Sequence, residues 1–363
     1  MAVDTLAFHI TDRCQLDCKH CLRDPGQRPV DLDFDLFVRV LDEVTRVYRS
    51  QHVALTGGEP TLHPRFVEMI DAIAARGLTW HMVTNGKNFP WLMERFTESP
   101  TRRGAMSRVY LSVDGADEAT HDRIRGPGSF REVMRACALA SAHDTAFVTQ
   151  MAVNAYNEHH VESFGLLASQ LGAARASFAI LQPTGTPHDC DLYLPASAWR
   201  GIRDRIDRLA SSLTMPVTMP EGWPQALPFH VCAPFRSELL HVDVRGHLNL
   251  CCQQAGIPQS PNPPSGESDV AADLRTSSVV EGHSALLGII HRAQEAKLRA
   301  IAASALDEWD FFPCNWCLKH FGKPHWGKEG NAGPEAARER WVGAWGELKG
   351  QSALRTRLPL LGR

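Results

Sequence analysis

The strongest constraint on the fold is a regular alternation of strand and helix patterns over the first 215 of 363 residues. Helical periodicity, with apolar residues three and four positions apart, covers residues 34–48, 65–76, 90–96, 130–143 and 160–171. Short apolar runs between these segments predict strands at residues 6–10, 52–56, 79–84, 108–113, 146–153 and 176–181. Strands that alternate with helices predict an α/β fold whose parallel sheet has right-handed crossovers. Six such units are too few for a closed eight-stranded barrel.

Distinctive motifs follow the predicted strands at their carboxyl ends, where α/β barrels place their reactive groups. A cysteine loop follows the first strand, and Gly57-Gly58-Glu59-Pro60 follows the second. Paired glycines allow another group to approach the backbone closely, and Glu59 can accept hydrogen bonds from an ammonium group. Ser112 and Asp114 end the fourth strand on one face, because strand side chains alternate. Asn154 ends the fifth strand in the same way.

The cysteine loop has the spacing C-x3-C-x2-C, formed by Cys14, Cys18 and Cys21. Three thiolates on one tight loop can hold three corners of a cubane iron–sulfur cluster and leave the fourth iron open for an outside ligand. A zinc knuckle is the alternative, although zinc sites usually have four protein ligands. An open iron is useful in a catalytic cluster, so this loop predicts a catalytic metal centre.

With the Gly-Gly-Glu-Pro motif downstream, this loop resembles the signature of the radical S-adenosylmethionine (radical SAM) enzymes. The resemblance implies a partial (β/α)6 barrel, and a [4Fe–4S] cluster that binds S-adenosylmethionine (SAM) and cleaves it to a 5′-deoxyadenosyl radical. In the family, the residue before the third cysteine is often aromatic, and here it is His20. The cofactor contacts that the resemblance implies come from Gly57, Gly58, Glu59, Pro60, Ser112, Asp114, Asn154 and His20.

A second set of cysteines lies far downstream, comprising Cys232, Cys251, Cys314 and Cys317. Taken alone, two thiols near a hairpin and a distant C-x2-C pair could bind zinc or a second iron–sulfur cluster. Behind a barrel of this type, the pattern resembles the twitch module, the shorter form of the SPASM auxiliary domain. The resemblance implies an auxiliary [4Fe–4S] cluster, and the spacing favours Cys251 over its neighbour Cys252 as a ligand. Two [4Fe–4S] clusters and SAM are therefore the predicted cofactors.

The composition changes after residue 215, which predicts three parts: a barrel at 1–215, a small α+β auxiliary-cluster domain at 216–334, and a helical tail at 335–363. A helix at 196–213 ends the first part. Within the second, residues 239–244 and 247–251 predict a β-hairpin, residues 255–281 a long loop rich in Pro, Ser and Gly, and residues 285–303 a helix.

The resemblance implies removal of a hydrogen atom from a substrate and leaves the next step open. One hypothesis is two-electron oxidation of a sugar or aminocyclitol, with the auxiliary cluster accepting an electron. A second is epimerisation, in which Cys252 or Cys190 returns a hydrogen atom to the substrate radical. A third is crosslinking or epimerisation of a ribosomal peptide. The start of the chain, close to the first strand, leaves no room for a fused peptide-recognition domain, which modestly favours a small molecule. The non-enzymatic alternative is an iron–sulfur scaffold or a zinc-binding module.

Composition and charge narrow the classes of partner. The net charge is −3 and the isoelectric point about 6.6, so no electrostatic footprint for nucleic acid is present. No apolar run reaches membrane-spanning length, and the first residues lack the regions of a signal peptide. We therefore expect a cytoplasmic protein whose partners are a small-molecule substrate, or alternatively a peptide, and an electron donor such as flavodoxin or ferredoxin.

Overall fold

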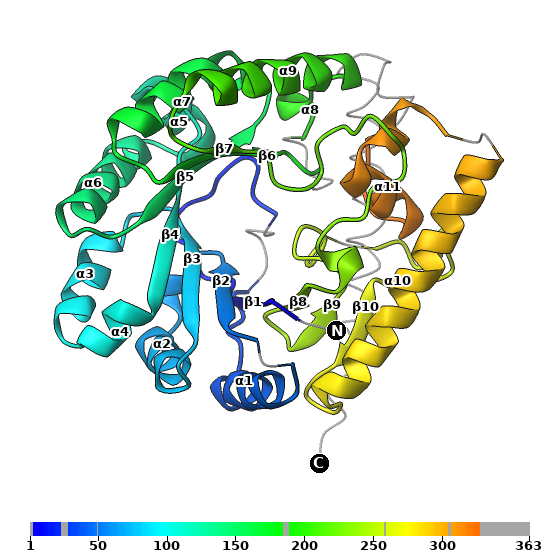
Figure 1. The fold of residues 1–363 in the computed structure, drawn as a ribbon, viewed down its shortest axis with the longest axis horizontal. Coiled ribbons are helices and arrows are strands. Elements are labelled where there is room, and N and C mark those ends of the chain that lie inside the picture. Colours follow the sequence, from blue (N-terminus) through cyan, green and yellow to red (C-terminus); the bar gives the residue numbers. More distant parts are fainter. Residues whose placement is uncertain are drawn as a thin grey trace, which may run out of the picture.

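A curved sheet forms the frame of the molecule (Figure 1). The structure is a computed structural model that describes residues 3–22, 28–48, 50–183, 189–257, 259–303 and 306–326. Within these residues the sheet has ten strands in the order β10-β9-β8-β1-β2-β3-β4-β5-β6-β7. The run from β8 to β7 is parallel, and β9 and β10 join it in antiparallel pairing. The α/β fold predicted from the alternation is confirmed.

The six expected strands are present at nearly the predicted positions. They are β1 (Thr5–Thr11), β2 (His52–Gly57), β3 (Thr79–Thr84), β4 (Met106–Ser112), β5 (Phe147–Val153) and β6 (Arg175–Ile180). A two-residue strand, β7 (Val217–Thr218), extends the sheet beyond β6 and has no signal in the sequence. Each parallel step brings another carboxyl end to the same edge of the sheet, where the motifs lie.

Helices cover the outer, convex face of the sheet (Figure 1). Those the periodicity predicts are α1 (Phe34–Tyr48), α2 (Phe66–Ala75), α3 (Phe89–Thr97), α6 (Ser129–Ala142), α7 (Val161–Gln170) and α9 (Ala196–Ser212). Shorter helices that the periodicity did not predict are α4 (Pro100–Ala105), α5 (Glu118–Arg125) and α8 (Asp189–Leu192). The core lies between the helices and the sheet. Phe8 on β1 packs 4.6 Å from Phe37 on α1, measured between ring centres.

The second part of the chain continues the same sheet. Strand β8 (Leu239–Val242) pairs in parallel with β1, and the predicted hairpin forms with β9 (His247–Asn249). Strand β10 (Val270–Asp273) pairs with β9, so the prediction of an unbroken loop over residues 255–281 is wrong at these residues. Pairing of β8 with β1 makes one continuous sheet from the parts of the chain before and after residue 215. The division into two domains at this residue stays a prediction.

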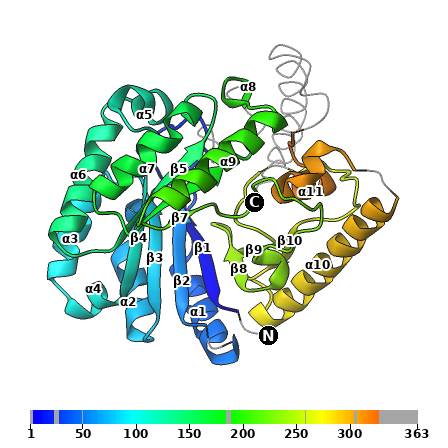
Figure 2. The ribbon, with the colours of Figure 1, turned by 45° about the horizontal axis from the view of Figure 1, so that its top comes forward.

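Helix α10 (Val279–Ala302) lies along the hairpin and β10, beside the barrel (Figure 2). It begins six residues before the predicted start, because Ser278 and Glu281 form a capping box at its first turn. Helix α11 (Pro313–His320) follows and carries the last two cysteines. The predicted tail at 335–363 lies outside the described residues. Among the residues that are described, none of the helices has both the length and the apolar character needed to span a bilayer.

Candidate active site

The cysteine loop leaves the carboxyl end of β1 and is half-buried. Cys14, Cys18 and Cys21 take part in no disulfide within the described residues. The Leu16 N–H donates to the Cys14 Sγ at 3.4 Å, and the Cys21 N–H donates to the Cys18 carbonyl at 3.0 Å. Burial raises the pKa of the Cys18 thiol to about 12; the Arg125 guanidinium opposes this, and Cys21 and Cys14 add to it. The thiols therefore lie close enough to influence one another, as three ligands of one cluster must.

Two glycines, Gly57 at the end of β2 and Gly58 directly after it, are required by the cysteine loop itself. A Cβ on Gly58 would meet the Arg13 carbonyl oxygen far inside van der Waals contact, and one on Gly57, whose φ is +148°, would meet the Thr11 carbonyl oxygen. The Gly58 N–H donates to Thr11 O and the Glu59 N–H to Arg13 O, each at 2.7 Å. The close approach expected of a ligand is thus made here by the backbone of residues 11–13. The turn after β2 fixes the course of the loop that carries the thiols.

The Glu59 carboxylate is completely buried and fully engaged. Its Oε1 accepts from the Thr61 hydroxyl at 2.8 Å, and its Oε2 accepts from the Thr84 hydroxyl at 2.8 Å and the Asn85 N–H at 3.0 Å. Burial raises its pKa, and these hydrogen bonds act against that rise. The side chain therefore ties the turn after β2, where Pro60 starts a short 3-10 helix, to the end of β3. Contacts of Gly57, Gly58, Glu59 and Pro60 with SAM stay predictions.

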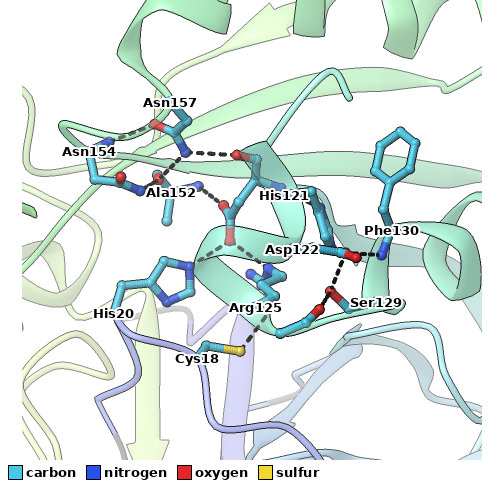
Figure 3. Close-up of polar contacts among 12 residues, drawn as sticks. Cys18, His20, His121, Asp122, Arg125, Ser129, Phe130, Ala152, Asn154 and Asn157 are labelled. Atoms are coloured by element: carbon cyan, nitrogen blue, oxygen red, sulfur yellow. Dashed lines mark hydrogen bonds and ion pairs between the residues drawn. The ribbon is translucent and has the colours of Figure 1, made fainter. Parts of the chain in front are cut away.

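Asp114 is the centre of a buried polar network after β4, and its partners His20, Arg125 and Ala152 are labelled in Figure 3. Its Oδ2 lies 2.6 Å from His20 Nε2 and 2.5 Å from Arg125 Nε. Its Oδ1 accepts from the Ala152 N–H at 2.8 Å. Burial by itself would raise the pKa of this carboxyl, but the Arg125 guanidinium and His20 hold it well below its usual range. Asp114 thus links the cysteine loop, the α5 region and β5 through one carboxylate.

Arg125 connects this network to the cluster loop. Its Nη1 lies 3.9 Å from Cys18 Sγ (Figure 3). The Lys19 N–H also donates to the Ile124 carbonyl at 3.0 Å, which fastens the cysteine loop to the end of α5. The Arg125 guanidinium is paired with the carboxylate of Asp114.

Two asparagines beyond β5 complete the network. The Asn154 amide donates to the Ala152 carbonyl at 2.9 Å, and its oxygen accepts from the Tyr156 N–H at 2.9 Å. Asn157, also fully buried, donates to the carbonyl oxygens of Asp114 at 3.1 Å and Ala152 at 3.0 Å (Figure 3). The Asn154 side chain therefore shapes the turn after β5.

Sequence reasoning singled out Asn154 and missed Asn157 and His121. His121 accepts from the Asp114 N–H at 3.1 Å, and burial lowers its pKa to about 4. Both lie on segments without a motif of fixed spacing, so no sequence signal pointed to them. Ser112 is 8% exposed beside this network. The predicted SAM contacts of Ser112, Asp114, Asn154 and His20 stay predictions.

Histidines line the inner face of the sheet. His241 on β8 pairs in register with Ala7 on β1, and Ala54 on β2 pairs with both Ala7 and His81 on β3. Partners in register share a face, which here is the face turned away from the helices. Burial lowers the pKa of His81 and of His241 to about 3 each. The His241 Nδ1 is buried without a hydrogen-bond partner among the described residues.

The four cysteines of the second set converge. Cys314 and Cys317 are buried on α11, and Cys232 and Cys251 are partly buried on separate segments. Burial raises the pKa of Cys314 above its usual range, and neighbouring Cys251, Cys317 and Cys232 raise it further. Three chain segments thus bring their thiols close enough together for each to affect the pKa of Cys314. Four thiols are the donor set that a [4Fe–4S] cluster uses, so the residues fit such a group.

Cys251 and Cys252 lie side by side in this group. Interaction between the two thiols raises the pKa of Cys251 and lowers that of Cys252, and Cys252 also lies near Cys314. The Gln253 N–H donates to Cys251 Sγ at 3.4 Å, which is the same two-residue pattern that Cys14 shows. Hydrogen bonds to ligand sulfurs are typical of cluster sites, which supports Cys251 as the ligand. The role of Cys252 as a hydrogen donor stays a prediction, and the side chain of Cys190, on α8, lies outside the described residues.

The auxiliary thiols lie at the same edge of the sheet as the first set. Gly222 packs against Cys314, since an added Cβ would lie 3.0 Å from its Sγ. That Cβ would also be 2.6 Å from Ile180 and 3.3 Å from Gln182, at the carboxyl end of β6. In the described ranges, no three His, Cys, Asp or Glu side chains could hold a metal ion between them. The ligand roles of both cysteine sets stay predictions.

Comparison with known proteins gives a family match for the first part of the chain. Residues 8–167 match the family described as the Radical SAM superfamily. This chain carries a radical SAM domain. The match runs from β1 into α7 and includes the cysteine loop, the Gly-Gly-Glu-Pro turn and Asp114.

Three curated relatives are similar to this chain over half of its length or more. The chain is 32% identical over 188 residues to mycofactocin maturase MftC of Mycobacterium tuberculosis (strain CDC 1551 / Oshkosh), covering 51% of this chain and 46% of that protein. It is 30% identical over 196 residues to AdoMet-dependent heme synthase of Methanosarcina barkeri (strain Fusaro / DSM 804), covering 53% and 54%. It is 28% identical over 325 residues to GTP 3',8-cyclase of Klebsiella pneumoniae (strain 342), covering 83% and 88%. The chain thus spans about half the length of the first two.

Two solved structures share the fold of this chain. Streptococcus suis SuiB bound to precursor peptide SuiA has a TM-score of 0.59 at 11% identity, over 79% of this chain and 66% of that one. The protein anSMEcpe with bound AdoMet and Kp18Cys peptide has a TM-score of 0.61 at 14% identity, over 80% and 83%. These likenesses extend past the matched domain and concern the fold.

Proposed function

We propose that this chain binds SAM at a [4Fe–4S] cluster held by Cys14, Cys18 and Cys21 and uses it to abstract a hydrogen atom from a peptide substrate. When bound, the cluster and SAM supply the radical chemistry. The chain supplies position: the backbone of the turn after β2 holds the cysteine loop, and Asp114 with Arg125 fastens it to the α5 region. A radical reacts efficiently only when the substrate is held close to it. A cysteine loop that is fixed in place by these contacts favours such positioning.

The auxiliary set supports a second [4Fe–4S] cluster in the same reaction. Cys314 lies at the carboxyl end of β6, and the first cysteine set lies at the carboxyl end of β1. Both sets therefore border one edge of the curved sheet, where substrate would lie between them. A cluster at Cys232, Cys251, Cys314 and Cys317 would accept an electron from the substrate radical once a proton has left it. An external donor such as flavodoxin or ferredoxin would return the first cluster to its reduced state.

The observation that carries the peptide assignment is the similarity to MftC, which is named a maturase, over half of this chain. Two proteins of the same fold, SuiB and anSMEcpe, have been seen with peptides bound. Because the chain spans about half of MftC, the assignment rests on the shared domain and the auxiliary thiols. Crosslinking, oxidation and inversion of a residue are all within reach of a substrate radical.

Oxidation of a sugar or aminocyclitol is the second candidate function. The relative that aligns over most of this chain, GTP 3',8-cyclase, has a small molecule in its name. Epimerisation, with Cys252 or Cys190 returning a hydrogen atom, is the variant in which the auxiliary cluster accepts no electron. These reactions differ in product mass, since oxidation or crosslinking removes two hydrogens and epimerisation removes none.

The test is anaerobic. The protein is reconstituted with iron and sulfide, reduced with dithionite, and mixed with SAM and either short peptides encoded beside its gene or a panel of sugars and aminocyclitols. We expect 5′-deoxyadenosine well above background with one peptide, and a change in the mass of that peptide. A rise with sugars alone would replace the peptide assignment by the second candidate. A triple variant, Cys14→Ala, Cys18→Ala and Cys21→Ala, is expected to form no 5′-deoxyadenosine.

A further inference from the structure

A lysine is buried beside the auxiliary thiols. Lys297, on α10, is 6% exposed. Its Nζ donates to the Asp310 carbonyl oxygen at 3.1 Å and lies 4.8 Å from the centre of the Trp316 ring. The Asp310 carboxylate lies 3.6 Å from the Nζ of Lys319. Among the described residues, no carboxylate forms an ion pair with Lys297, so a carbonyl and a ring face are its contacts.

The charged groups around Lys297 include the predicted cluster ligands. Trp316 lies between Cys314 and Cys317 on α11, so the ammonium rests on the helical turn that carries both thiols. Burial lowers the pKa of Lys297. Four neighbouring groups raise the pKa of Lys297 and so oppose the effect of burial. In decreasing order of effect, they are Cys317, Asp310, Cys314 and Cys232. Three of these four groups are predicted cluster ligands, and the fourth, the Asp310 carboxylate, lies 3.6 Å from the Nζ of Lys319.

A second buried lysine shows the usual solution. Lys323 lies 2.6 Å from the Asp269 carboxylate and also donates to the Gln254 carbonyl at 2.7 Å. A buried charge without such a partner is costly, and proteins normally pair it. Lys297 lacks a carboxylate partner in the described part of the chain. Four thiolates around a [4Fe–4S] cluster carry a net negative charge that would supply one.

We propose that Lys297 is the counter-charge of the auxiliary cluster and makes that cluster easier to reduce. The proposal rests on the auxiliary cluster of the proposed function. Reduction adds one electron and so one negative charge, which a nearby buried ammonium stabilises, because electrostatic interactions are strong away from water. Cluster potentials depend on net charge, hydrogen bonds and solvent exposure, and Lys297 changes the first of these. An electron acceptor next to a substrate radical needs such a favourable potential.

The test compares Lys297→Met, which removes the charge, with Lys297→Arg, which keeps it. Each protein is reconstituted, its iron and sulfide are counted, and the auxiliary cluster is titrated with dithionite while EPR is recorded. We expect Lys297→Met to make reduction of this cluster about tenfold less favourable, a fall of about 59 mV for one electron. Lys297→Arg should stay near the wild-type value. The cluster at Cys14, Cys18 and Cys21 is the internal control and should not shift in either variant.

Each possible result either supports or overturns the proposed role of Lys297. Equal shifts in both variants, or no shift in Lys297→Met, would overturn the proposal. If Lys297→Met fails to assemble the auxiliary cluster and Lys297→Arg assembles it, the counter-charge is needed even for binding, and the proposal stands. If neither variant assembles it, Lys297 acts through packing and the proposal fails. If the wild-type protein holds only one cluster, the auxiliary cluster of the proposed function fails first, and the metal count reveals this before any potential is measured.

Discussion

Asp114 shows, at the scale of one residue, how a single carboxylate organises the site. It is fully buried, and its two oxygens serve His20, Arg125 and the Ala152 N–H. Removing one partner from a buried ion pair leaves the other charge uncompensated. Arg125 would then be such a charge, beside Cys18.

We predict that Asp114→Asn lowers the free energy of unfolding by about 3–5 kcal/mol. Asp117→Asn is the matched control, because Asp117 caps α5 through the Thr120 N–H at 2.8 Å and its side chain is 57% exposed. That loss should be small, about 0.3–1 kcal/mol, because asparagine caps a helix as well as aspartate does and only the charge at the N-terminus of α5 is lost. Urea denaturation of the cluster-free proteins measures both. Equal losses in the two variants would show that the network around Asp114 is not coupled as described.

At the scale of the residue, the sequence predicted which residues belong to the site better than it predicted which of them contact each other. His20 and Asp114 were both singled out as cofactor contacts, but nothing in the pattern indicated that they contact each other at 2.6 Å. Residues 94 positions apart meet only because β1 and β4 end at the same edge of the sheet. Asn157 and His121 join this network without any sequence signal, because their role depends on backbone groups that only the folded turn presents.

At the scale of the element, the turn after β2 supports the cysteine loop through backbone contacts. Gly57 and Gly58 leave room for residues 11–13, and hydrogen bonds at 2.7 Å join the two segments. A side chain in this space would push the loop away from its place.

Gly58→Ala should therefore destabilise the protein and lower the amount of iron that the first site retains. Gly104→Ala is the matched control, because an added Cβ there meets nothing within 4 Å and the residue lies in α4. It should be neutral or stabilising by about 0.5–1 kcal/mol, as alanine is favoured in helices. Thermal unfolding and metal analysis measure the two effects. Unchanged iron content in Gly58→Ala would refute the supporting role of the turn.

Long elements with clear periodicity were predictable, and short ones were not. Helix α1 was predicted at its observed bounds because five of its apolar residues lie on one buried stripe. Helix α5 was missed because only His121 and Ile124 are buried in it. Strand β10 was missed because four residues within a segment rich in Pro, Ser and Gly carry little signal, and pairing with β9 determines their structure.

At the scale of the whole molecule, the continuous sheet encloses histidines on its inner face. His81 and His241 are held neutral, because burial lowers the pKa of each to about 3. In the unfolded chain their pKa is about 6.5. Acid therefore protonates the unfolded state first and shifts the equilibrium toward it.

We predict that the free energy of unfolding falls as the pH is lowered from about 6.5 toward 3, with His241 contributing about 3 kcal/mol of that loss by about pH 4. His241→Phe should flatten this part of the curve. His291→Phe, at an exposed position on α10, should leave the slope unchanged. Urea titrations at a series of pH values measure the slopes. The same slope in His241→Phe as in the wild type would contradict the assignment.

The measurement that tests the central claim most directly is the count of iron and sulfide per chain after anaerobic reconstitution. The account predicts about eight iron atoms in the wild-type protein, as two [4Fe–4S] clusters require. The triple variant of Cys14, Cys18 and Cys21 to alanine should retain about four, held by the auxiliary thiols. A wild-type count of about four, or a triple variant that matches the wild type, would contradict it.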